Sequence, residues 1–163
     1  MIYKQIIKMR SAVLVYLTHR MALPILKKIR KPEHFPYSVV ALQQFPENSL
    51  GHDLVNFLHQ KELKLLPYYA RHDIKHILLK YDTTDEGEGC LQCFMLGNGH
   101  ISFPVLATIL YGLITMPEYG RSFRRAYMRG RKATQISGWK WFEILHLPTK
   151  ELQYKIEPNI SNN

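Results

Sequence analysis

The segment Arg71–Glu88, RHDIKHILLKYDTTDEGE, contains two histidines four residues apart, with an aspartate directly after the first. On a helix that turns about 100° per residue, His76 lies ~40° and Asp73 ~100° from His72. Glu88 falls in the first turns of the helix expected next, where an antiparallel pair would return it to the histidines. Two imidazoles and up to two carboxylates suit zinc, iron, manganese or cobalt. The alternative is a polar helix face that binds no metal.

Two known kinds of metal site compete for this spacing. A zinc peptidase would require Glu in place of Asp73 and a third ligand further along the chain. An HD-type phosphohydrolase would use His72 and Asp73 centrally, with His52 or His59 upstream and a distant Asp, but the last Asp is Asp85. Beyond the four candidate metal ligands, His72, Asp73, His76 and Glu88, the pattern identifies no catalytic residue.

The elements that must position these side chains are predicted to be helices, because no stretch alternates long enough to predict a strand. We expect an all-α chain with a single helical body. The predicted helices are 38–45, 50–60, 67–81, a helix from a Thr83–Glu86 capping box to about Leu96, a buried helix over 103–115, 117–130, and two short pieces, GWKWFEIL and TKELQYKI.

Charge divides the chain into an arm, residues 1–33, and a body, residues 34–163. Residues 1–32 contain eight bases and no acid, whereas the rest of the chain has 14 bases and 13 acids. Residues 2–22 show helical periodicity, so we expect a basic amphipathic helix that lies on an anionic membrane surface or packs on the body. A net positive charge that lies mostly in an arm is atypical of nucleic-acid binding, and we predict no nucleic-acid partner.

The two cysteines, Cys90 and Cys93, are too few for a disulfide framework and are interpreted as core thiols, with a spare metal ligand as the minor alternative. No apolar run reaches the ~18 residues of a membrane span. The basic arm, together with the family resemblance given in the next paragraph, leads us to expect a peripheral protein, on the cytoplasmic face of a membrane or, alternatively, on the matrix side of the mitochondrial inner membrane.

The segment HDIKHILLKYDTTDEGE resembles the HDxxH…E motif of the coenzyme Q biosynthesis protein 4 family, which acts in ubiquinone biosynthesis. Eleven residues separate His76 from Glu88, as in that family. The turn Asn48–Gly51, the TTDEGE step and the tail with Trp139, Trp141, Glu143 and PTKELQ are also similar, so the resemblance covers roughly residues 45–156. The helix after Glu88 and the segment before His72 depart from the family pattern, which bears on substrate identity.

The resemblance implies that His72, Asp73, His76 and Glu88 bind a divalent metal, most often zinc in that family. It implies a polyprenylated quinone precursor as substrate, and oxidative decarboxylation with hydroxylation of the ring at the same carbon. It also implies association with other quinone-biosynthesis enzymes and a homodimer. The alternative is a non-catalytic lipid-binding scaffold that organises these enzymes.

A prenyl tail requires an apolar groove, since each buried CH2 contributes ~0.8 kcal/mol. Candidates for its lining are the apolar residues near the motif, although each is more simply interpreted as core: Leu78, Leu79, Phe94, Met95, Leu96 and the helix from Phe103 to Met116. Arg71 or the run Arg121–Arg131 could neutralise the substrate carboxylate.

Overall fold

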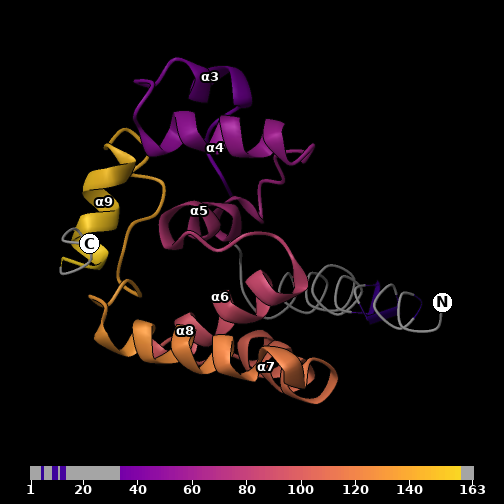
Figure 1. Cartoon of the computed structure of the whole chain (residues 1–163). Helices are drawn as coiled ribbons and strands as arrows, with labels where there is room; N and C mark the ends of the chain where they lie inside the picture. Colours follow the sequence, from indigo (N-terminus) through magenta and orange to yellow (C-terminus); the bar gives the residue numbers. More distant parts are fainter. Residues whose placement is uncertain (1–4, 6–8, 11, 14–33, 159–163) are drawn as a thin grey trace. The chain divides into compact units, whose positions relative to one another are not determined.

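The structure, a computed structural model, describes residues 5, 9–10, 12–13 and 34–158 (Figure 1). All its regular elements over these residues are helices, so the all-α prediction is confirmed. Within the described residues, β-type backbone pairing occurs as an isolated bridge between Ser49 and Pro148. The predicted helix over residues 2–22 lies largely outside the described residues, although the five described positions within it are helical. None of the described helices is long and apolar enough to cross a membrane.

Two compact units share the chain, and both are discontinuous in sequence. One contains residues 1–32 and 82–132, and the other contains residues 33–81 and 133–163. The predicted body, 34–163, therefore contributes to both units.

The unit of residues 33–81 and 133–163 contains α3 (Val39–Gln43), α4 (Leu50–Gln60), α5 (Ala70–Leu79) and α9 (Thr149–Ile156). Ser49 caps α4, because its Oγ accepts a hydrogen bond from the His52 N–H. The C-terminal segment is joined to this cap, since the Leu50 N–H donates to the Leu147 carbonyl. The core is aliphatic and aromatic, and includes Leu54, Leu58, Ile74, Leu78, Leu145, Leu152 and Ile156.

The unit of residues 1–32 and 82–132 contains α6 (Asp85–Gly97), α7 (Phe103–Thr115), the short 3-10 helix η2 (Pro117–Tyr119) and α8 (Gly120–Lys132). α6 packs against both α7 and α8. The crossing of α6 and α8 brings backbone against backbone: a Cβ on Gly97 would overlap the Tyr127 carbonyl, and a Cβ on Gly130 would overlap the Phe94 carbonyl. Only glycine fits at these two positions, so the pair fixes how closely the helices approach.

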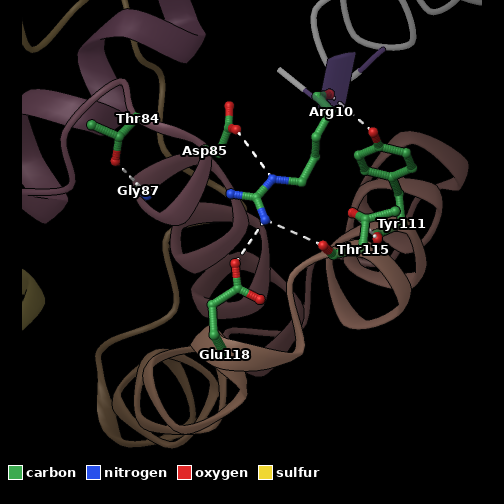
Figure 2. A network of polar contacts seen from close by, with 7 residues as sticks. All are labelled: Arg10, Thr84, Asp85, Gly87, Tyr111, Thr115 and Glu118. Atoms are coloured by element: carbon green, nitrogen blue, oxygen red, sulfur yellow. Dashed lines mark hydrogen bonds and ion pairs between the residues drawn. The ribbon is translucent and has the colours of Figure 1, made fainter. Parts of the chain in front are cut away.

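Arg10 joins the described part of the N-terminal segment to this unit (Figure 2). Its Nη1 donates to the Glu118 carboxylate at 2.7 Å and to the Thr115 carbonyl at 3.2 Å, while its Nε lies 3.6 Å from Asp85 Oδ2. The Tyr111 hydroxyl donates to the Arg10 carbonyl. Burial alone would lower the pKa of Arg10, but Glu118 and Asp85 outweigh it and raise that pKa. The Arg10 side chain is therefore paired with carboxylates of its own unit, and 9% of it is exposed.

Several predicted helix boundaries are wrong. α5 begins at Ala70, because residues 67–69 form a turn and Pro67 precedes the helix. α6 is capped by Thr84 and not by Thr83, since the Thr84 Oγ1 accepts from the Gly87 N–H. The piece GWKWFEIL forms turns, whereas TKELQYKI is the helix α9.

The predicted helix over residues 103–115 has the predicted bounds, but the prediction that it is buried is wrong for one of its faces. Val105, Thr108 and Gly112 are buried, but the opposite face of α7 is exposed. The largely apolar composition, without a charged residue, predicted a helix covered on every side.

Candidate metal centre

The two histidines lie on the same helix, α5, one turn apart. Their ring centroids are 4.7 Å apart, so both imidazoles project in the same direction. α5 forms here because its other face carries Ala70, Ile74 and Leu78, which are buried at helical spacing in the core of the unit. The predicted pairing of His72 with His76 is thus realised.

His76 is only 2% exposed and is oriented by two neighbours. Its Nδ1 lies 3.0 Å from the Tyr81 carbonyl oxygen, and the Phe57 ring of α4 stacks on its imidazole. A carbonyl can only accept a hydrogen bond, so Nδ1 is the donor, and a neutral imidazole held in this way has its lone pair on Nε2. A hydrogen bond from Nδ1 to a backbone carbonyl is common behind histidines that bind a metal through Nε2.

His72 is more open, with 28% of its side chain exposed. Its ring contacts Tyr69, and its Nδ1 lies 3.8 Å from Asp73 Oδ1. That distance is too long for a hydrogen bond but places a carboxylate beside the imidazole. Asp73 is therefore positioned to orient His72, whereas its role as a ligand stays a prediction.

A short connection carries the chain from α5 to α6. Lys80 ends α5 in the left-handed conformation (φ 56°), which is costly for a residue other than glycine. Asp82 Oδ1 accepts from the Thr84 N–H at 3.0 Å. A Cβ on Gly87 would overlap the Asp82 backbone, so α6 starts in direct contact with this turn. The turn thereby sets the position of the residue that follows Gly87.

Glu88 follows Gly87, and its N–H donates to the Thr84 carbonyl in the first turn of α6. A carboxylate here is favoured by the positive end of the helix dipole. His72, His76 and Glu88 form a group that could hold a metal ion: each offers one ligand atom, and these atoms lie within 4.8 Å of one another. Two nitrogens and one carboxylate oxygen leave a fourth tetrahedral position for water or substrate.

The other candidates lie apart from this group. The group includes neither His52 nor His59, which the phosphohydrolase interpretation would use. Cys90 and Cys93 are buried and free of disulfides, and burial foremost raises the pKa of Cys90 to about 11 and that of Cys93 to about 12. Thiols this resistant to ionisation are poor nucleophiles and poor metal ligands.

The sequence suggested residues that would line a groove for a prenyl tail and an arginine that would bind the substrate carboxylate. Leu78, Leu79, Phe94 and Met95 are buried core residues. The guanidinium of Arg71 lies over the Phe142 ring at 5.6 Å, next to the histidine pair in sequence.

Sequence reasoning missed two features of the site, namely the Tyr81 carbonyl behind His76 and the close contact of Gly87. The Tyr81 carbonyl is a backbone atom, so the residue types in the sequence do not indicate its contact with His76. The contact of Gly87 has a weak signal, because glycine in the first turn of a helix is unfavourable unless something approaches it closely.

Comparison with known proteins identifies the fold. No protein-family model and no curated protein sequence matches the chain. Among solved structures, the chain is similar to the crystal structure of a protein from Nostoc punctiforme PCC 73102 named "Putative ubiquinone biosynthesis protein". The TM-score is 0.61 at 23% identity, over 86% of this chain and 81% of that chain. At this identity, the likeness establishes that the two chains share a fold.

Proposed function

We propose that the chain binds a divalent metal through His72, His76 and Glu88 and acts in ubiquinone biosynthesis. The observation that carries the proposal is the convergence of these three side chains, at the spacing of the HDxxH…E motif. The name of the Nostoc protein, which shares the fold, supports the same pathway.

The donor atoms fit a divalent ion. His76 would bind the ion through Nε2 of its neutral imidazole, and Glu88 supplies a negative charge that offsets part of the charge of the ion. Zinc is the first expectation for two nitrogens and a carboxylate, and iron, manganese and cobalt accept the same donors.

We further propose that the substrate is a polyprenylated aromatic carboxylate, and that the reaction is oxidative decarboxylation of its ring. For every two ring carboxyls lost as carbon dioxide, one dioxygen supplies the two hydroxyl oxygens that replace them. A bound metal would supply Lewis-acid stabilisation of ring oxygens. The chain's own contribution is to orient the ligands, and Arg71 is the nearest candidate in sequence to pair with the substrate carboxylate.

Elemental analysis of the purified wild type, His76→Ala and His59→Ala tests the metal site. His59 is an exposed histidine of the same unit and serves as the matched control. We expect near-stoichiometric metal in the wild type and in His59→Ala, and its loss in His76→Ala. Equal metal content in all three proteins would contradict the site.

Asp73→Asn separates ligation from orientation. A carboxylate that only orients His72 should leave metal bound with about 10- to 100-fold lower affinity, as is typical of residues behind a ligand. A direct ligand should behave like His76→Ala.

Activity is tested with Glu88→Gln, which keeps the size of the side chain. In this variant, quinone production and metal content should both fall, while the melting temperature of the metal-free variant should equal that of the metal-free wild type. Normal quinone production by a metal-free Glu88→Gln would favour the non-catalytic scaffold.

A further inference from the structure

The outward face of α7 is a stripe of large apolar side chains. Five of its residues are between 45% and 73% exposed, at positions that recur on one side of a helix: Phe103, Leu106, Leu110, Leu113 and Ile114. No side chain of α7 is charged. Ile101, just before the helix, extends the stripe and is 71% exposed. A contiguous apolar surface of this kind is typical of a protein or membrane contact.

The helix that follows in the same unit is strongly basic. α8, GRSFRRAYMRGRK, has six bases and no acid. Its buried side, Phe123, Ala126 and Gly130, faces inward, while Arg121, Arg124, Arg125, Arg131 and Lys132 are exposed. η2 joins the two helices and contacts both, so the basic helix begins beside the end of the apolar one (Figure 1).

We propose that α7 and α8 form a surface that docks on an anionic lipid bilayer. The apolar stripe would enter the boundary between head groups and acyl chains, and the exposed bases of α8 would pair with anionic head groups. At about 1.5 Å per residue, the 13 residues of α7 span roughly 20 Å, which is too short to cross the hydrocarbon core. α7 is therefore suited to lying in the interface. A second copy of the chain is a poorer occupant, because like charges on the two α8 helices would repel.

This surface differs from the basic arm expected from the sequence, and it does not depend on the metal proposed above. Arg10, one base of that arm, is turned inward, whereas the five exposed bases of α8 are accessible. Bare vesicles therefore suffice as the probe.

The test is co-sedimentation of the full chain with phosphatidylcholine vesicles, with and without phosphatidylglycerol. We expect the wild type to bind the anionic vesicles and to release them as salt rises. Phe103→Ser/Ile114→Ser should weaken that binding on the order of 100-fold, since each side chain contributes roughly tenfold. Arg121→Gln/Arg125→Gln should weaken it roughly 30-fold at low salt, about fivefold for each base.

The matched controls replace exposed apolar residues with serine, or exposed bases with glutamine, in the unit of residues 33–81 and 133–163. Val40 and Leu66 are 68% and 46% exposed, so Val40→Ser/Leu66→Ser controls for loss of exposed apolar surface. Lys64→Gln/Lys150→Gln controls for loss of exposed charge. Both controls should bind within twofold of the wild type.

Three results would overturn the proposal. If the wild type does not bind anionic vesicles, α7 and α8 do not form a membrane-docking surface. If the α7 and α8 variants bind vesicles as tightly as the wild type, the membrane contact lies elsewhere, for example on the arm. If Phe103→Ser/Ile114→Ser instead halves the mass in sedimentation equilibrium while vesicle binding is absent, the stripe is a dimer interface.

Discussion

Gly87→Ala should lose metal although every candidate ligand remains. An added Cβ would overlap the backbone and the side chain of Asp82, and the backbone cannot rotate away as a flexible side chain can. Cβ atoms rarely approach other heavy atoms closer than 3.4 Å, so the start of α6 must move by roughly 1 Å. Glu88 is the next residue and must move with it. Because metal–ligand distances tolerate only about ±0.2 Å, the affinity should fall at least tenfold.

The stability cost can be worked from the same contact. Overpacking costs about 1–3 kcal/mol, and alanine returns up to ~1 kcal/mol of helix propensity. The net loss of about 1–2 kcal/mol corresponds to a melting temperature lower by roughly 2–8 °C for a chain of this size. The loss should persist with a chelator present, because it does not arise from the metal.

Gly120→Ala is the matched control, since a Cβ at Gly120 meets nothing within 4 Å. Calorimetric titration with zinc and thermal unfolding of the two variants would be compared. A Gly87→Ala protein that binds zinc like the wild type and melts within 1 °C of it would refute the reasoning that this glycine positions Glu88.

Three other predictions concern the unit of residues 1–32 and 82–132. Gly130→Ala should destabilise the protein by about 1–2 kcal/mol in urea unfolding, because its Cβ overlaps the Phe94 carbonyl and the gain in helix propensity offsets only part of that cost. Cys93, whose pKa is raised to about 12, should react with a thiol reagent at pH 8 at least ~100-fold more slowly in the native than in the urea-unfolded protein; equal rates would contradict its burial. The pKa of Glu118 is lowered by a hydrogen bond from its own backbone and by Arg10, so its contribution is present above pH 4.5 and is lost as pH falls through the lowered pKa. The stability difference between the wild type and Arg10→Met should therefore shrink below pH 4.5 in denaturant titrations, and a constant difference would contradict the pairing.

The sequence predicted what depends on local periodicity and capping chemistry. The helices 103–115 and 50–60 have the predicted bounds, because proline, serine and apolar spacing act within a few residues. The pairing of His72 with His76 follows from helix geometry alone. GWKWFEIL was predicted as a helix from its composition, but the structure forms turns there.

What the sequence did not predict depends on contacts between distant segments. The inward orientation of Arg10 depends on Glu118, 108 residues away, and a charge count assigns it to a solvated arm. The exposure of α7 was missed because composition does not distinguish an apolar helix inside a core from one on a surface. The Tyr81 carbonyl behind His76 is a backbone atom, to which every residue type contributes equally.

The interleaving of the two units has a consequence for synthesis on the ribosome. Residues 33–81 emerge early, but their unit is closed only by residues 133–163, where Gln153 bonds to the Ile77 carbonyl and the Thr149 N–H donates to Asn48. Domains that are continuous in sequence can fold as they emerge, N-terminal first. Here the segment carrying the histidine pair must wait until the whole intervening unit has been translated. Truncation of the chain before α9 would therefore destabilise the helix that bears His72 and His76, although both histidines are present.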